Sequence, residues 1–308
     1  MLRTIKYQIE YFFVWLLESL FFLLPRALAL SCGERIGLLV AFFLPKREKL
    51  ILQNLTYAFP SKSKSEIKAL ARSTWKNLGR TAVEFIRISD IDSAHFHNFF
   101  LFEGENYMEE AQKQGKGIIM ATFHFTNWEM TGIALQYRWK NIVAIARPLK
   151  NSYVEKWVQQ KRSQNGMEII LHRQAVRASL KSLKAGKSIG ILMDQNLYQG
   201  GVFIDFMGRP AATTTLPALL HIRTGAPVIL IYSVREREKF RIVYERPIQF
   251  PPIEPAEERL RMYTQIITNH IEAVIRRHPE NWFWIHNRWK RSPYLESSLK
   301  TPEMGQHE

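Results

Sequence analysis

The stretch GIIMATFHFTNWEM, residues 117 to 130, begins with a hydrophobic run that stops at His124. Glu129 follows His124 five places later. The run before His124 predicts a β-strand, and Thr126 or Asn127 is suited to cap a helix that comes next. Residues five apart on one unbroken helix diverge by about 140°, which would point the two side chains away from each other. If His124 lies in a turn before the helix, Glu129 in the first helical turn is expected to reach the imidazole.

This pairing has a chemical consequence. A carboxylate bonded to one imidazole nitrogen fixes the tautomer and stabilises the imidazolium, which leaves the other nitrogen free to act as a general base. His124 and Glu129 are therefore the candidate catalytic residues, with Glu129 orienting His124. The alternative is that His124 is a structural residue at a strand end and Glu129 only complements the positive end of a helix. The spacing alone leaves both readings open.

Short β-rich runs alternate with helical patterns through most of the chain. The candidate strands are 117–123, 142–146, 167–171, 188–193 and 227–234, and the candidate helices are 65–87, 128–138, 151–164, 174–185 and 213–224. This alternation predicts an α/β fold with a central, largely parallel sheet flanked by helices. In such folds ligands bind beyond the carboxyl ends of the strands, where His124 is expected to lie.

The N-terminal region is strongly apolar. Residues 11–24, YFFVWLLESLFFLL, contain a single acid, Glu18, and the apolar stretch from 5 to 24 approaches the length of about 20 residues that spans hydrocarbon. No small-residue cleavage site follows it, so we predict an uncleaved membrane-anchor helix that either spans the bilayer or lies in its interface. A buried core helix is the alternative.

A second apolar run, 36–44, is followed by Lys46, Arg47 and Lys49. This arrangement predicts that the body of the protein lies on the cytoplasmic face of the membrane. The expected division is a membrane anchor with interfacial helices over 1–45, a catalytic domain over 46–295 and a polar tail over 296–308.

The formal net charge of +15 favours a polyanionic partner, which can be nucleic acid, anionic lipid or an acidic protein. One acid-free stretch has basic residues at roughly helical spacing: Arg173, Arg177, Lys181, Lys184 and Lys187. They form either a helix face for anionic headgroups or a solvated surface. The single cysteine, Cys32, excludes an internal disulfide, and no histidine pair has zinc-ligand spacing with a third partner, so neither a metal nor a cofactor is expected.

HFTNWE at 124–129 resembles the H-x4-(D/E) signature of glycerolipid-type acyltransferases, in the glutamate form typical of the lipid A late acyltransferases. These are the lauroyl and myristoyl transferases of Gram-negative bacteria. Other stretches resemble the same family in order: NLTYAFP at 54–60, NLGRTAVEFIR at 77–87, ARP at 146–148, MDQN at 193–196, GVFIDFMGRPAATTTLPALLHIRTGAPV at 201–228 and HPENWFWIHNRWK at 278–290. Each piece is weak alone, but six in the right order are specific, and the resemblance extends from the anchor to about residue 291.

The resemblance implies an enzyme anchored in the bacterial inner membrane that moves an acyl chain from acyl carrier protein to a hydroxyl of a lipid A precursor. His124 would take the hydroxyl proton during direct attack on the thioester, without an acyl-enzyme. The acidic carrier protein, the anionic acceptor and anionic inner-membrane lipids would then all meet a basic surface.

The resemblance also implies substrate-binding roles. Arg147, which follows a strand, would bind phosphate or an oxyanion, and Asp194 and Gln195 would support the site, with Asp194 holding an arginine. Asn127 is either a site donor or a helix cap. Arg147 can also be a plain surface residue.

The segment GVFIDFMGRP adds an expected acyl or lipid channel. Val202, Phe203 and Phe206 would line it, with Arg209 as its polar anchor, although core packing explains the aromatic residues equally well. The tryptophans of NWFWIHNRWK suit either a belt at the membrane interface or the core, and His286 among them is expected to be structural.

Two other functions remain open. One is a related membrane acyltransferase that acts on another lipid, such as a lysophospholipid or an amino-acid lipid. The other is a membrane-tethered nucleic-acid-binding protein, which the charge permits but no binding motif supports, so no nucleic-acid partner is expected.

Overall fold

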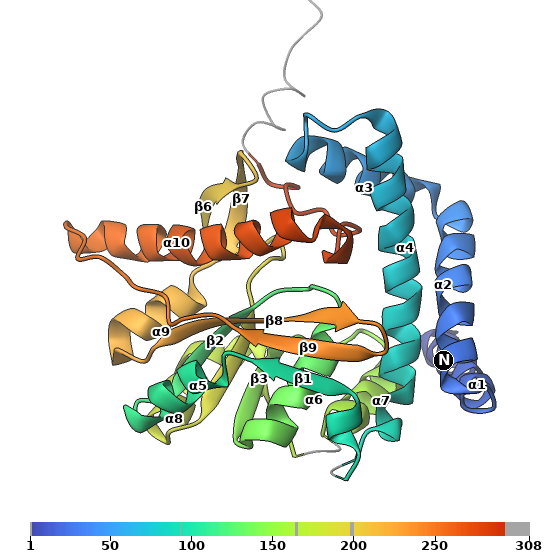
Figure 1. The fold of residues 1–308 in the computed structure, drawn as a ribbon, viewed down its shortest axis with the longest axis horizontal. Coiled ribbons are helices and arrows are strands. Elements are labelled where there is room, and N and C mark those ends of the chain that lie inside the picture. Colours follow the sequence, from blue (N-terminus) through green and yellow to red (C-terminus); the bar gives the residue numbers. More distant parts are fainter. Residues whose placement is uncertain (1, 93, 164–165, 198–199, 293–308) are drawn as a thin grey trace, which may run out of the picture.

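The computed structural model describes residues 2–92, 94–163, 166–197 and 200–292. Its centre is a seven-stranded sheet in the order β1-β9-β8-β2-β5-β3-β4 (Figure 1). These strands are β1 (Phe100–Glu103), β2 (Ile118–Thr122), β3 (Ile142–Ala146), β4 (Glu168–Leu171), β5 (Ser188–Leu192), β8 (Val228–Glu236) and β9 (Lys239–Tyr244). Neighbouring strands are parallel except β8 and β9, which confirms the predicted largely parallel sheet.

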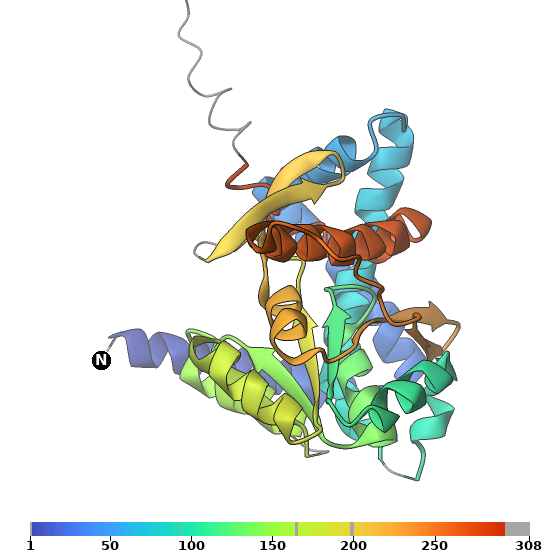
Figure 2. The same ribbon diagram turned by 90° about the vertical axis from the view of Figure 1, so that its left-hand side faces the viewer.

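Both faces of this sheet are covered by helices of the described residues. The α-helices of the described part of the chain are α1 (Leu2–Phe22), α2 (Arg26–Phe43), α3 (Pro45–Ala58), α4 (Lys64–Ile86), α5 (Glu105–Lys113), α6 (Trp128–Trp139), α7 (Ser152–Ser163), α8 (Ala175–Lys184), α9 (Leu216–Thr224) and α10 (Ala256–Arg277). α5 and α6 pack on one face, and α8 and α9 pack on the other. A separate antiparallel hairpin, β6 (Gly201–Phe206) and β7 (Arg209–Thr214), lies with α10 above the sheet in Figure 2.

The apolar run 117–123, which contains strand β2, is continuous because both faces of this strand are covered. Ile119 and Ala121 pack in the core shared with α8 and α9, whereas Ile118 and Met120 pack in the core shared with α5 and α6. A parallel strand covered on both faces needs apolar residues at every position rather than at every second one.

Each strand and helix predicted from the sequence is present, and the largest shift is at the start of α9. The expected helix from residue 213 begins at Leu216 because Thr213 and Thr214 belong to β7, where they pair with β6. β-branched threonines favour such an extended, paired backbone. The strands β1 and β9, the hairpin β6–β7 and the helices α5 and α10 were not predicted.

The N-terminal helices α1 and α2 pack on the rest of the chain through two kinds of contact. α2 lies close against α4 because glycines meet there: a Cβ on Gly79 would stand 2.0 Å from the carbonyl oxygen of Gly33. α1 is held on α7 by Glu18, which pairs with Lys161 at 2.5 Å and accepts from Trp157 Nε1 at 2.7 Å. These bonds account for the one acid in the apolar run.

Much of the apolar surface of α1 and α2 remains exposed. Examples are Phe12, Phe13 and Trp15 on α1, and Phe42, which is 80% exposed, on α2. The alternative of a buried core helix is therefore wrong for α1. Within the described part of the chain, no single helix is both long and apolar enough to cross a membrane; α2 and α3 meet that test only as a pair, bent by 100°. The predicted tail, 296–308, lies outside the described residues.

Candidate active site

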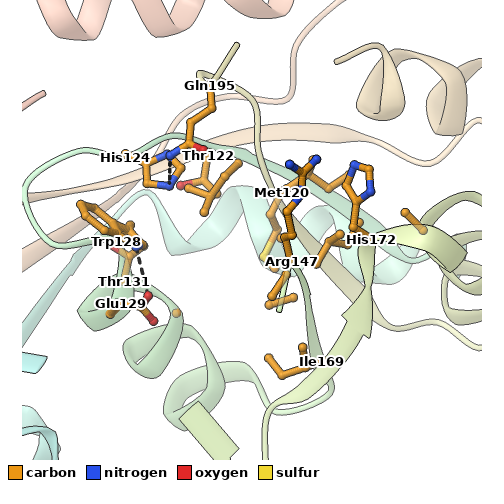
Figure 3. Close-up of a pocket in the computed structure, with 18 of the residues that line it drawn as sticks. Met120, Thr122, His124, Trp128, Glu129, Thr131, Arg147, Ile169, His172 and Gln195 are labelled. Carbon is orange, nitrogen blue, oxygen red and sulfur yellow. Dashed lines mark hydrogen bonds between the residues drawn. The ribbon is translucent and has the colours of Figure 1, made fainter. Parts of the chain in front are cut away.

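His124 lies in the turn between β2 and α6, at the carboxyl edge of the sheet (Figure 3). Thr126 has a φ of 50°, in the left-handed region, so the chain bends sharply between strand and helix. Asn127 is the N-cap of α6, and its side chain accepts from the backbone N–H of Met130 at 3.2 Å. The strand, turn and helix start expected from the sequence are thus confirmed.

The turn is held in place from two directions. From α4, Thr81 Oγ1 donates to the carbonyl of Thr126 at 3.0 Å. From the C-terminal segment, the N–H of Phe283 donates to the carbonyl of His124 at 3.1 Å, and the N–H of Thr126 donates to Asn281 at 2.8 Å. The position of the imidazole therefore depends on segments that are far apart in the sequence.

Asn127 belongs to this support and not to a substrate site. Its side chain is fully buried, and its Nδ2 donates to Glu84 Oε2 at 2.9 Å. Burial alone would raise the pKa of Glu84, but the charge and hydrogen bonds of Arg235 outweigh burial, and the pKa is lowered. The prediction that Asn127 binds substrate is wrong, and the helix-cap alternative is confirmed.

Asp194, two residues after β5, is the partner of the imidazole. His124 Nδ1 lies 2.8 Å from Asp194 Oδ1, and the backbone N–H of His124 donates to Oδ2 at 3.0 Å. Trp282 Nε1 also donates to Oδ2, at 2.7 Å. Burial by itself would raise the pKa of Asp194, but the charge of His124 and these hydrogen bonds hold that pKa below its usual value. The carboxylate therefore stays ionised.

This geometry corrects two expectations. The predicted hydrogen bond between Glu129 and His124 is wrong, because Asp194 occupies Nδ1. Asp194 is only 4% exposed and supports the site through His124, but within the described residues no arginine bonds to it, contrary to expectation; the buried guanidinium nearby, that of Arg288, donates to the carbonyl of Ala212 at 2.7 Å.

Glu129 faces α7 instead of the imidazole. Its Oε2 accepts from Arg162 Nε at 2.9 Å, and its Oε1 accepts from Trp128 Nε1 at 3.1 Å. Burial would lower the pKa of Arg162, but the hydrogen bond and charge of Glu129 raise it. The indole of Trp128 lies between Glu129 and His124, with its ring centroid 4.8 Å from that of the imidazole (Figure 3). Glu129 therefore reaches His124 only through Trp128.

The second imidazole nitrogen faces a neutral group. Because Nδ1 carries the proton that Asp194 accepts, Nε2 is left as an acceptor. Gln195 Nε2 lies 3.1 Å from it, which places Gln195 beside the candidate base as the sequence led us to expect.

A cavity of about 450 Å³ opens beside this nitrogen. Its lining includes apolar residues from α6, from the strands that α6 covers and from the start of β4: Met120, Gly132, Leu135, Ile142, Ala144, Met167, Ile169 and Ile231. Across the cavity from His124, Arg147 lies beside His172, as Figure 3 shows. The cavity thus joins an apolar interior to a basic entrance, and Arg147 is at the place expected for it.

The predicted channel residues lie elsewhere. Phe206 is 1% exposed and packs against Trp282 and Trp289 in the core, so its core-packing alternative is confirmed. Val202 and Phe203 are on the same strand, β6, which packs on α10 rather than over the carboxyl edge, and neither belongs to the cavity lining that the structure describes. Val202 and Phe203 are therefore not at the cavity beside His124, and an acyl or lipid channel lined by them stays a prediction.

Arg209 is also separate from the candidate base. Its guanidinium stacks over Tyr57, 3.6 Å from the ring centroid, and it lines a second cavity with Arg276. The structure therefore does not bring Arg209 together with His124, and its role as the polar anchor of a lipid channel stays a prediction.

Three site residues were missed. Arg162 and His172 lie in no motif, so nothing in the sequence singled them out. Trp282 belongs to HPENWFWIHNRWK, whose tryptophans were expected either at the membrane interface or in the protein core. Trp282, Trp284 and Trp289 are at most 2% exposed, which confirms that they lie in the core.

His286 supports the loop that carries Gln195. Its Nε2 accepts from the N–H of Asn196 at 2.8 Å, which confirms a structural role, and burial lowers its pKa to about 4. An unfolded histidine has a pKa of about 6.5, so the unfolded chain binds a proton that the folded chain excludes between these two values.

We therefore expect the stability that neutral His286 contributes to be complete above about pH 6.5 and to fall by about 2 to 3 kcal/mol as the pH drops to about 4. Urea unfolding followed by tryptophan fluorescence across this range would measure it. His286→Gln keeps an acceptor for Asn196 but does not titrate, so its stability should change less. An identical pH dependence in both proteins would contradict the assignment.

The chain is similar to known bacterial acyltransferases over most of its length. Residues 1–291 match the family described as bacterial lipid A biosynthesis acyltransferase. The chain is 28% identical over 280 residues to a lipid A biosynthesis palmitoleoyltransferase of Escherichia coli (strain K12), covering 90% of this chain and 89% of the relative.

A lipid A biosynthesis lauroyltransferase of the same organism is 24% identical over 285 residues, covering 91% of this chain and 90% of the relative. A phosphatidylinositol mannoside acyltransferase of Mycolicibacterium smegmatis (strain ATCC 700084 / mc(2)155) is 22% identical over 188 residues, 60% of each chain. Because the family match extends over nearly all of its length, the chain belongs to the bacterial lipid A biosynthesis acyltransferase family.

Proposed function

We propose that the enzyme moves a fatty acyl group from an acyl carrier protein thioester to a hydroxyl of a lipid A precursor at the cytoplasmic face of the inner membrane. Family membership supports acyl transfer in lipid A biosynthesis. The observation that carries the proposal is the position of His124 Nε2, which faces a largely apolar cavity while Nδ1 is bound to a buried carboxylate. A base at the mouth of an apolar pocket suits a reaction between a hydroxyl and a long acyl chain.

In the proposed reaction, Nε2 of His124 takes the proton of the acceptor hydroxyl as its oxygen attacks the thioester carbonyl carbon. The C–O bond forms, the tetrahedral intermediate collapses, and the C–S bond breaks. The imidazolium then returns the proton to the departing thiolate. Asp194 holds the Nδ1 proton throughout and stabilises the imidazolium, so that no acyl-enzyme is needed.

Glu129 has a positioning role in this scheme. Its bonds to Arg162 and Trp128 fix the indole against the imidazole and tie α6 to α7 at the cavity wall. Arg147, at the basic entrance, is placed to bind a phosphate of the acceptor, because a guanidinium suits phosphate oxygens in a bidentate manner.

The apolar interior of the cavity is the proposed site of the acyl chain, and Gly132 in α6 lies on its wall. A Cβ at Gly132 would stand 3.7 Å from Met167 Sδ, which is ordinary contact, whereas a longer side chain would fill the space beyond. We expect Gly132→Leu to reduce transfer of the longest accepted chain relative to shorter ones by about 10-fold or more.

Product masses from a mixture of donors of different chain lengths would measure this change. Gly132→Ala is the matched control, since its single methyl group fits, and it should shift the distribution less. An unchanged distribution with Gly132→Leu would place the acyl chain elsewhere.

For the membrane, we propose that residues 1–45 lie in the bilayer interface and residues 46–295 carry out the transfer. The exposed apolar residues of α1 and α2 support this, because an apolar helix face is buried at the boundary between headgroups and acyl chains, and the amphipathic indole of Trp15 favours the headgroup level. Glu18 keeps α1 on α7, next to the wall of the cavity, so lipids at α1 would lie close to the site.

The proposed donor and acceptor can be tested together. Purified enzyme is offered acyl carrier protein and acyl coenzyme A as donors, with a lipid A precursor and a lysophospholipid as competing acceptors, and the products are identified by mass spectrometry. We expect transfer from the carrier protein to the lipid A precursor. Preferred acylation of the lysophospholipid would favour the related membrane acyltransferase instead.

A further inference from the structure

The positive charge of the chain is concentrated in the segment that forms one side of the cavity. Residues 141–193, from β3 to the end of β5, contain ten lysines and arginines but only two acids, Glu155 and Glu168. This excess of eight is more than half of the net charge of +15. Such a local excess indicates a surface for an anionic partner.

Within this segment, α8 and the residues just before it present a continuous basic face. Arg173, Arg177, Lys181 and Lys184 follow one another at helical spacing, and all four are exposed. None of them forms a salt bridge within the described residues, whereas Lys187, after the helix, pairs with Glu168. The four cations, the basic face of α8, are thus free to meet carboxylates from outside.

This face begins at the entrance of the cavity. Ala175, the first residue of α8, lines the cavity together with His172 and Arg147. Two apolar side chains beside it are also exposed, Leu171 at 45% and Val176 at 39%. A partner bound here would therefore stand where a thioester must enter, and it would find apolar contacts among the charges.

The position of α8 favours a protein partner over a lipid surface. Figure 1 shows α8 on the opposite side of the molecule from α1 and α2, whose exposed apolar residues are the proposed contact with the bilayer. A bilayer that touches α1 and α2 would not also cover a face at the other side.

We propose that the basic face of α8 is the docking surface for the acidic carrier protein, which delivers its acyl thioester into the cavity past His172. This inference rests on the proposed carrier-protein donor and adds where that donor binds. Electrostatic complementarity of this kind sets the encounter rate and the specificity of association, and it weakens with salt.

The test is the double charge reversal Arg177→Glu/Lys181→Glu in the full-length enzyme in detergent. We expect the Kd for acylated carrier protein, measured by fluorescence anisotropy, to rise about 10-fold or more, because like charges would then face each other. Selectivity for the carrier-protein thioester over an acyl pantetheine thioester, which lacks the acidic protein, should fall by a similar factor. The remaining affinity should depend less on salt.

Lys64→Glu/Lys68→Glu is the matched control. It has the same spacing and the same change in charge on an exposed helix surface, but α4 begins at the top of Figure 1, far from α8. Equal loss in both variants, or unchanged binding in Arg177→Glu/Lys181→Glu, would overturn the proposal. So would a loss of binding to anionic vesicles with carrier-protein binding intact, which would assign the face to lipid. If the wild-type enzyme does not use carrier protein at all, the proposed donor fails and not merely the docking site.

Discussion

His124→Ala is expected to lower kcat for acyl transfer by about 10²- to 10⁴-fold, because the acceptor hydroxyl loses its general base. The imidazole is 12% exposed and its Nε2 faces the cavity, whereas His172, the other histidine of the described lining, lies across the cavity from it. Initial rates with saturating donor and acceptor would measure the loss. His97→Ala is the control, since His97 is exposed on the short helix Phe96–Asn98 and is remote from the cavity.

Near-normal turnover by purified His124→Ala would exclude the proposed mechanism. Because the backbone of His124, and not its side chain, bonds to Phe283, the turn should keep its shape in the variant. An unchanged unfolding midpoint would show that the loss is chemical.

Asp194→Asn is expected to lower kcat by about 10²- to 10⁴-fold as well, through the orientation of the base. The carboxylate accepts from Nδ1 and from the backbone N–H of His124, and it also accepts from Trp282. An asparagine has only one accepting oxygen, so it cannot accept all these bonds and can instead donate to Nδ1, which selects the wrong tautomer. The readout beside the rate is the imidazole tautomer, observed by ¹⁵N NMR.

Glu129→Gln is the comparison variant that tests which carboxylate, Glu129 or Asp194, fixes the tautomer of His124. It weakens the contact with Arg162 but leaves the bond between Asp194 and Nδ1 in place, so the tautomer should be that of the wild type. If Glu129→Gln changes the tautomer and Asp194→Asn does not, the pairing expected from the sequence would be right and the pairing in the structure wrong.

The sequence predicted that Glu129 pairs with His124, whereas Asp194 does so in the structure, and the reason is the distance along the chain. The helix cap at Asn127 and the turn at His124 were predictable because both depend on residues within a few positions of each other. Asp194 is 70 residues away from His124 and meets it only because β5 lies beside β2 in the sheet. Thr122 pairs with Leu192 in that register, so the residues two places further on face each other at the carboxyl edge. Strand order is not encoded in local periodicity.

The surroundings of Glu129 and Phe206 are likewise set by elements that are distant in the sequence. Glu129 is near His124 in sequence, but α7 brings Arg162 to it, and a guanidinium binds a carboxylate through two hydrogen bonds. Phe206 stands in a family-like motif, yet its hairpin packs on α10, which places the ring in the core between tryptophans.

The sequence by itself determined the α/β class, the strand that ends at His124, the capped helix after it and the family, because periodicity, capping and ordered motifs are local properties. Only the tertiary structure decided which carboxylate holds the imidazole, which residues line the cavity and where the basic face of α8 lies. Those features arise where parallel strands from distant segments end side by side, and the free energy of such contacts depends on neighbours that the chain brings together only by folding.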